Sequence, residues 1–158
     1  MRVFECVPNV SEGRDAATLD ACARAIEEAG ATLAHRTSDG AHNRSVFTFF
    51  GTRTTIFDAV VALATVVRER VDLRVHRGAH PRIGALDVVP FVPFGSATER
   101  DAIELARAAA LAIWQRLRVP SYYYGAAADP PRALPAVRAG GFEGLATRAD
   151  PPDVGDAA

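Results

Sequence analysis

The alternation of hydrophobic and polar residues along the chain predicts a succession of strands and amphipathic helices. Short runs rich in β-branched and aromatic residues are typical of strands, and apolar residues that recur every three to four positions are typical of helices. Strands are predicted at residues 2–7, 31–37, 44–50 and 85–92. Helices are predicted between residues 15 and 30, from about 55 to 71, and from 96 to about 118.

Residues with known capping preferences mark the ends of these helices. Asp15 is expected to cap the first helix and Gly30 to end it. Capping boxes are expected at the start of the next two helices, formed by Thr55 with Asp58 and by Ser96 with Glu99. The order of elements matches a ferredoxin-like βαββαβ unit, so the predicted fold class is α/β (α+β), with the helices on one face of the sheet.

The pattern weakens towards the C-terminal end of the chain. Extra elements are expected there, a short strand at 121–124 and a short helix at 131–139. From residue 150 onward the sequence has no core-forming pattern. We therefore expect one folded subdomain at 1–149 and a tail or linker at 150–158.

Two predicted strands are apolar on both faces. A sheet with helices on one side should alternate apolar and polar residues, yet Val46, Phe47, Phe49 and Phe50 are consecutive or nearly so. The strand at 85–92 shows the same property. A bare apolar face would expose a large patch, so we expect another domain, a subunit or a ligand to cover it.

The composition excludes several classes of protein. The net charge is −1 and 49% of the residues are apolar, so there is no global attraction to nucleic acid or to an acidic membrane surface. No apolar run approaches the roughly 20 residues of a membrane span, and no signal-peptide pattern is evident. Cys6 and Cys22 lack metal spacing and are expected to be buried thiols. A cytoplasmic location follows, and the exclusive use of arginine as the basic residue suggests a GC-rich bacterial genome.

Residues 76–84 (HRGAHPRIG) concentrate groups that handle protons and anions. The glycines and the proline rule out a helix here. The imidazole of His80 can act as an acid or a base near neutral pH. The guanidinium of Arg82 can bind a carboxylate, although pairing with a nearby residue such as Asp87 is an equal alternative.

Further polar residues lie at the predicted strand ends, which often line binding sites. Asp39 occupies a Ser-Asp-Gly turn, where aspartate is common for conformational reasons alone. The other candidates are Asn9, Ser11, Glu12, Asn43 and Arg44. Arginines between residues 68 and 82 form either an anion-binding rim or a solvated helix end. His42, His76 and His80 have no carboxylate or cysteine at a recognisable spacing to complete a ligand set, so a metal site is a poor interpretation of them.

Four blocks of the sequence occur in the order of a known family. They are 5–13 (ECVPNVSEG), 42–51 (HNRSVFTFFG), 76–93 (HRGAHPRIGALDVVPFVP) and 124–127 (YGAA). Together they resemble the N-terminal subdomain of glutamate formiminotransferase. The resemblance implies transfer of a formimino group from N-formiminoglutamate to N5 of tetrahydrofolate in histidine degradation, although some members use formylglutamate.

The resemblance also implies roles for individual residues. His80 falls on the family's catalytic histidine and would act as general base and acid, with Asp39 beside it to orient the ring or stabilise its cation. Tetrahydrofolate is the co-substrate, and no metal is expected. The substrate and folate are expected to contact Arg82, Asn9, Ser11, Glu12, Asn43 and Arg44. Many relatives carry a carboxylate where this chain has Ala79.

The resemblance further implies that the chain does not act alone. In the family a second, similarly folded subdomain packs against the first, and folate lies between them. The tail at 150–158 would lead towards that C-terminal subdomain or a partner chain, and the complete enzyme is expected to be a homodimer. The alternative is a non-catalytic half-domain that binds folate, another small anion or a protein partner. A nucleic-acid-binding module is disfavoured by the charge and the scarcity of interleaved aromatics.

Overall fold

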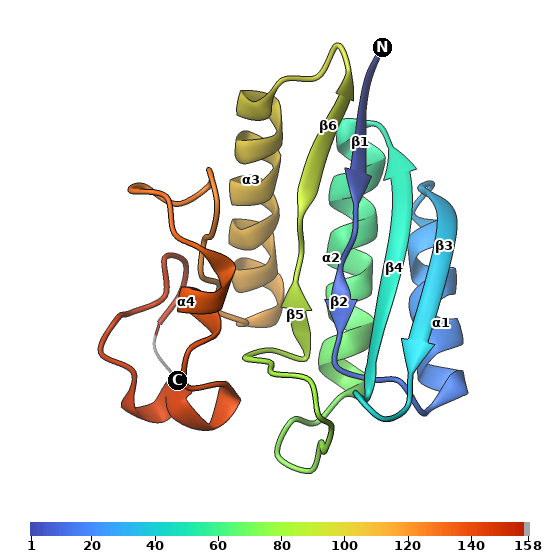
Figure 1. The fold of residues 1–158 in the computed structure, drawn as a ribbon. Coiled ribbons are helices and arrows are strands. Elements are labelled where there is room, and N and C mark those ends of the chain that lie inside the picture. The colour runs from blue at the N-terminus through green and yellow to red at the C-terminus, as the bar shows by residue number, and fades with distance from the viewer. Residues whose placement is uncertain (157–158) are drawn as a thin grey trace.

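Three long helices pack against one face of an antiparallel sheet in this computed structural model, which describes residues 1–156 (Figure 1). The helices are α1 (Ala16–Glu28), α2 (Arg53–Arg70) and α3 (Glu99–Leu117), followed by the short α4 (Leu134–Arg138) and a 3₁₀ turn (Phe142–Thr147). The strands are β1 (Arg2–Cys6), β2 (Asn9–Val10), β3 (Thr32–Asp39), β4 (Arg44–Gly51), β5 (Leu86–Val88) and β6 (Phe91–Gly95). The predicted mixed α/β class is confirmed.

The predicted strand at 2–7 is confirmed as β1, but the sheet has more strands than expected because β2 follows Pro8 and because Pro90 interrupts the strand predicted at 85–92. Hydrogen-bonded neighbours run β5–β2–β4–β1–β6, with β3 paired to β4 and every pair antiparallel. Pro8 separates β1 from β2, and Pro90 separates β5 from β6. Proline has no N–H to donate to a ladder. The predicted strands at 31–37 and 44–50 are confirmed as β3 and β4, and β3 continues to Asp39.

The predicted start of α1 is confirmed, and the capping boxes predicted for α2 and α3 are wrong. The carboxylate of Asp15 accepts a hydrogen bond from the Ala17 amide at the start of α1. Helix α2 begins earlier than expected, and Thr52 caps it. Helix α3 begins later, at a capping box of Thr98 with Asp101. At the start of α3, Ser96 with Glu99 and Thr98 with Asp101 have the same Ser/Thr-x-x-acid spacing, so the local pattern alone did not select the pair that forms the capping box.

The hydrophobic core lies between the sheet and the three long helices. Phe47 and Phe49 of β4 are fully buried against it, whereas the alternate residues Val46 and Phe50 are only half-buried on the opposite face. Phe94 of β6 is 46% exposed on that opposite face and lies edge-on to Phe50, with ring centroids 6.0 Å apart. Within residues 1–156 no helix covers this side, which we call the uncovered face (Figure 1).

The C-terminal segment is largely irregular but packs against the body of the fold. The strand predicted at 121–124 is wrong, since Ser121 forms only an isolated bridge with Val154. The predicted helix at 131–139 shortens to α4. Gly155 lies so close to Trp114 of α3 that an added Cβ would come within 2.6 Å of the indole. None of the helices described here is long and apolar enough to cross a membrane.

Candidate active site

Three chain segments meet at one end of the sheet and build the site. They are the turn after β2, the turn between β3 and β4, and the loop at 76–84 (the HRGAHPRIG loop). Glycines permit their close approach. A Cβ on Gly13 would lie 2.4 Å from the Asp39 carbonyl, and a Cβ on Gly78 would lie 2.3 Å from the His42 carbonyl. The sequence therefore places glycines where these backbones touch.

Asn43 joins all three segments through its side chain. Its φ of +49° is a left-handed conformation that asparagine tolerates. The side chain is buried; its Oδ1 accepts a hydrogen bond from the Gly13 amide at 2.9 Å, and its Nδ2 donates to the Arg77 carbonyl at 3.1 Å. The amide group is thus engaged on both sides within the protein, and Asn43 contributes to the framework of the site.

Ser11 and Glu12 also contribute to this framework. The buried Ser11 hydroxyl donates to the Gly84 carbonyl at 2.8 Å. The Glu12 carboxylate accepts hydrogen bonds from the amides of Arg14 and Asp15. These contacts link the turn after β2 to the HRGAHPRIG loop and to the start of α1. The side chains of Ser11, Glu12 and Asn43 thus form hydrogen bonds within the protein, and their contact with the substrate or folate stays a prediction.

The structure brings three of the candidate residues, His80, Arg44 and Asn9, into contact. The Arg44 guanidinium donates to Nε2 of His80 at 2.6 Å and to Oδ1 of Asn9 at 3.2 Å. Because a guanidinium only donates, Nε2 of His80 is the acceptor and the neutral ring carries its proton on Nδ1. Asn9 is paired with Val46, so Asn9 and Arg44 share the uncovered face.

The surroundings of His80 favour its neutral form. Burial of the ring, together with the positive charges of Arg44 and Arg138, lowers the pKa of His80 from its usual value, and the nearby Asp87 acts in the opposite direction. A neutral imidazole at physiological pH is ready for proton transfer. The electrostatics at this position therefore suit an acid–base group.

Asp39 contacts His42, a residue that the sequence marked only as a poor metal candidate. One carboxylate oxygen accepts from the backbone amides of Ala41 and His42, and the other lies 2.8 Å from Nδ1 of His42. The hydrogen bonds from the His42 amide and ring lower the pKa of Asp39 to about 2. The His42 ring lies edge-on to His80, with centroids 6.4 Å apart and planes at 74°. His42 is thus the side chain that connects Asp39 with His80.

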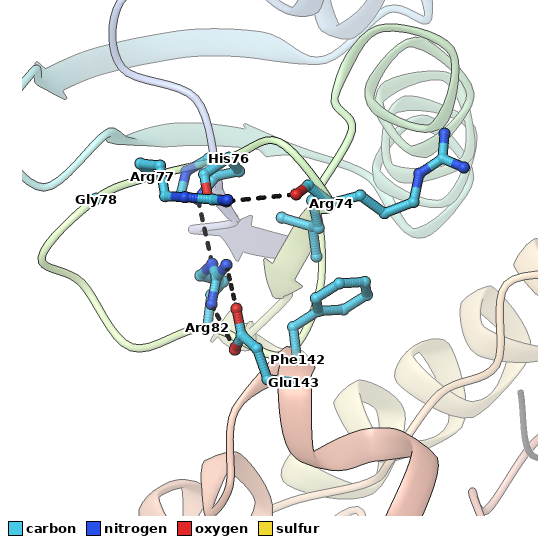
Figure 2. A pocket seen from close by; sticks show the side chains of 8 residues that line it. Arg74, His76, Arg77, Gly78, Arg82, Phe142 and Glu143 are labelled. Atoms are coloured by element: carbon cyan, nitrogen blue, oxygen red, sulfur yellow. Dashed lines mark hydrogen bonds and ion pairs between the residues drawn. The ribbon is translucent and has the colours of Figure 1, made fainter.

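Arg82 forms a bridge to the C-terminal segment (Figure 2). Its guanidinium donates two hydrogen bonds to the Glu143 carboxylate, at 3.0 and 2.9 Å, and its Nε donates to Nδ1 of the buried His76 at 3.1 Å. His76 in turn donates from Nε2 to the Asn43 carbonyl at 2.9 Å. Arg82 therefore has a carboxylate partner within the chain, and that partner is Glu143.

Asp87, the partner considered for Arg82, pairs with Arg138 of α4. The two Asp87–Arg138 contacts measure 3.1 and 2.6 Å, and the Asp87 side chain is only 2% exposed. The other carboxylate oxygen accepts from the amides of Ile83 and Gly84. This buried ion pair fixes the end of the HRGAHPRIG loop against α4.

An arginine-lined hollow lies behind the loop. It has a volume of about 330 Å³ and includes His76, Arg77 and Arg82 in its lining (Figure 2). It adjoins a second hollow of about 460 Å³ at the end of α2. Part of the positive charge is neutralised, because Arg74 pairs with Asp72 and Arg82 with Glu143. In the described part of the chain, the structure contains no group of three or more residues suited to hold a metal ion.

Sequence reasoning missed the residues that pair with the predicted ones. The pairing of Asp39 with His42 has a local signal, an aspartate that precedes a histidine by three residues within a turn. The partners of Arg82 and Asp87 have none, since Glu143 and Arg138 lie far along the chain.

Comparisons with known proteins cover almost the whole chain. Residues 3–158 match the family model for the formiminotransferase domain, N-terminal subdomain. The chain is 40% identical to the glutamate formimidoyltransferase of Streptococcus pyogenes serotype M1 over 149 residues, which are 91% of this chain and 49% of that protein.

Two further relatives come from distant organisms. The chain is 37% identical to the formimidoyltransferase-cyclodeaminase of Gallus gallus over 155 residues, 96% of this chain and 29% of that protein. It is 37% identical to the glutamate formimidoyltransferase of Thermoplasma acidophilum over 146 residues, 90% of this chain and 48% of that protein. The chain thus spans half or less of the length of these relatives. Because the family model matches nearly every residue, the chain belongs to the formiminotransferase family, as its N-terminal subdomain.

Proposed function

We propose that the chain is the catalytic N-terminal part of a glutamate formimidoyltransferase, which moves a formimino group from N-formiminoglutamate to N5 of tetrahydrofolate. The observation that carries this proposal is the family match over residues 3–158, which includes the position of His80. The group at that position has the chemistry the reaction needs, because His80 is held neutral beside Arg44 on the uncovered face.

The reaction moves one proton while it exchanges two bonds to carbon. N5 attacks the formimino carbon, a tetrahedral adduct forms, and the glutamate nitrogen leaves. His80 is the proposed general base and acid for this proton. Its neutral ring takes the N5 proton at Nε2 when Arg44 releases that nitrogen to bind a substrate carboxylate, and it returns the proton to the departing glutamate nitrogen. Arg44 and Asn9 lie where they can orient a substrate carboxylate or amide. Asp39 belongs to the site through His42.

A second subdomain completes the site by covering the uncovered face, with tetrahydrofolate held between the two. Two observations support this part of the proposal. The relatives are at least twice as long as the matched region, and the exposed Phe94 and Val92 offer an apolar surface on that face. Residues 1–149 are then the subdomain itself, and the segment from residue 150 is the link to the second one, with its last residues, 157 and 158, outside the described part of the chain. The complete enzyme would be a cytoplasmic homodimer.

The finer fold assignment belongs to the same proposal. If β1 with β2, and β5 with β6, each count as one interrupted strand, the sheet order becomes β5/β6–β1/β2–β4–β3. With α1 and α2 as the connections that pass behind the sheet, this arrangement is consistent with a ferredoxin-like βαββαβ unit.

The experiment is a transferase assay on the longest natural chain that contains this sequence. Mass spectrometry follows the folate product with N-formiminoglutamate as donor, with N-formylglutamate as an alternative donor, and with each substrate omitted in turn. The proposal predicts a product that is heavier by one formimino group and that requires both substrates. Folate binding without turnover would instead identify a non-catalytic half-domain.

A further inference from the structure

Two residues of the C-terminal segment, Phe142 and Glu143, hold Arg82 at several points. The Glu143 carboxylate accepts two hydrogen bonds from the Arg82 guanidinium, at 3.0 and 2.9 Å. The Phe142 amide donates to the Arg82 carbonyl at 2.9 Å, and the guanidinium carbon lies 6.0 Å from the centre of the Phe142 ring. The side chain and the backbone of Arg82 are therefore both fixed by this segment, and Figure 2 shows Arg82 between Glu143 and His76.

The backbone before Glu143 has the shape that this contact requires. Gly140 and Gly141 have φ of +84° and +62°, a conformation that glycine adopts without steric cost. A Cβ on Gly141 would lie 3.3 Å from Oε2 of Glu143 and 3.4 Å from the Arg82 carbonyl oxygen. The turn at these glycines thus brings the carboxylate against Arg82.

Hydrogen bonds continue from Arg82 towards the surroundings of His80. The Arg82 Nε donates to Nδ1 of the buried His76 at 3.1 Å, and Nε2 of His76 donates to the Asn43 carbonyl at 2.9 Å. Asn43 directly precedes Arg44, whose guanidinium donates to His80. A continuous path of contacts therefore joins Arg82 to the β4 residue that contacts the imidazole.

The covalent path from Arg82 to His80 is shorter still. Only Pro81 lies between the two residues. Its ring fixes its own φ and restricts the backbone of the preceding His80, so little rotation is available between the two side chains. The place and direction of His80 consequently depend on where Arg82 is held.

The simplest alternative is that Glu143 forms an ordinary surface ion pair. Its side chain is 67% exposed, and exposed pairs contribute little to stability. Arg82 is different, because its side chain is only 12% exposed and Glu143 fixes both terminal nitrogens of its planar guanidinium. The hydrogen bond from Arg82 also lowers the pKa of Glu143, so the carboxylate is ionised at physiological pH. The pair therefore fixes the orientation of Arg82 while adding little to the stability of the fold.

We propose that Glu143 is a positioning residue of the transfer reaction: by fixing Arg82, it holds the HRGAHPRIG loop in the arrangement that places His80 at the reacting groups. This inference rests on the proposed function. Glu143 itself contacts neither the substrate nor the reacting atoms, so its removal should slow the chemical step without weakening substrate binding. A small displacement of a catalytic group is enough to lower the rate by about 10²-fold.

The test compares Glu143→Ala with wild type in the transferase assay, using the longest natural chain that contains this sequence. The expected result is a loss of kcat of about 10–10²-fold, with unchanged KM values for N-formiminoglutamate and tetrahydrofolate and an unchanged denaturation midpoint. Glu143→Gln keeps one acceptor oxygen and should lose kcat by a smaller factor. Glu104→Ala is the matched control, because it removes the carboxylate of an exposed ion pair on α3 and should keep the wild-type kcat.

Hydrogen exchange gives a readout that does not depend on turnover. The Ala79 amide donates to the Ala41 carbonyl at 3.3 Å and so reports whether the HRGAHPRIG loop stays against the turn between β3 and β4. Its exchange should be faster in Glu143→Ala than in wild type and unchanged in Glu104→Ala. This difference would separate a displaced loop from a general loss of stability.

Each other outcome contradicts the inference. If folded Glu143→Ala keeps the wild-type kcat, or raises a KM while kcat is unchanged, the inference is overturned and the transferase function stands. Should Glu143→Ala not fold, Glu143→Gln decides in the same way, and a wild-type kcat in that variant overturns the inference. If wild type itself transfers no formimino group, the proposed function and the inference are both overturned.

Discussion

The Arg44 guanidinium donates a hydrogen bond to Nε2 of His80 over 2.6 Å, and this contact places the proton of the neutral ring on Nδ1 in the residue predicted to be catalytic. Arg44 lies on β4 and His80 on the HRGAHPRIG loop, so the contact depends on how these segments are held together. Variants at Arg44 and His80 test this contact and the chemistry that results. Variants at Gly78, Asp87 and Arg82 test the close approach and the ion pairs that position the loop.

Arg44→Met should raise the pKa of His80 towards its ordinary value. Burial and two arginines lower that pKa in the native protein, and the substitution removes one of the two charges. The imidazolium would then persist to higher pH than in wild type. An NMR titration of the His80 ring measures the change. Arg36→Met, which removes an arginine paired with Asp20, is the control, and an unaltered His80 titration in Arg44→Met would contradict the account.

Gly78→Ala should destabilise the protein by about 1–3 kcal/mol, as expected for overpacking against an element that cannot move. The added methyl group would meet the backbone of His42, at 2.3 Å from its carbonyl oxygen. Gly144→Ala is the matched control, because a Cβ there meets nothing within 4 Å. Urea denaturation compares the two variants. Equal stability of both would show that the loop does not press against the turn.

Asp87→Ala should cost about 3–5 kcal/mol in the free energy of unfolding. The substitution leaves Arg138 without its buried partner and removes the acceptor for the amides of Ile83 and Gly84. Asp20→Ala breaks an exposed pair with Arg36 and should cost under about 1 kcal/mol. Denaturation curves measure the free energy of unfolding of both variants. An equally small loss in the two variants would mean that the Asp87–Arg138 pair does not stabilise the fold.

Arg82→Met should lower the free energy of unfolding, and this loss should be its main effect rather than weaker substrate binding. It removes the donor to Nδ1 of the buried His76, and an unsatisfied buried acceptor costs about 1–3 kcal/mol. Arg74→Met, in the same hollow but on an exposed side chain, should leave the denaturation midpoint unchanged. A stable Arg82→Met protein with a raised KM for N-formiminoglutamate would instead indicate that Arg82 binds the substrate.

The hydrophobic pattern locates the regular elements because a helix or strand buries one face at its own period. It therefore identified α1, α2, α3, β1, β3 and β4. It ended the first strand before Pro8 but missed β2 beyond that proline, and it did not locate the interruption at Pro90, because a proline within an apolar run can also lie at a strand edge. Nor did it select the capping residues Thr52 and Thr98, since neighbouring positions offer the same side chains.

The sequence predicts the main residue of the candidate site, His80, but not most of the contacts between the site residues. His80 stands out because it lies with Arg82 in a loop that can form neither helix nor strand. The partners of Asp39 and Arg82 depend on backbone approaches at Gly13 and Gly78 between segments far apart in sequence. Such approaches leave no periodic signal, so only the folded chain shows that Asp39 meets His42 and that Arg82 meets Glu143.

The rate of formimino transfer by His80→Ala tests the central claim most directly. The assay uses the longest natural chain that contains this sequence, at saturating concentrations of N-formiminoglutamate and tetrahydrofolate, with Glu27→Gln on the exposed side of α1 as the control. The account predicts that His80→Ala loses about 10²–10⁴-fold in kcat while Glu27→Gln keeps the wild-type rate. A folded His80→Ala protein that turns over at the wild-type rate would contradict it.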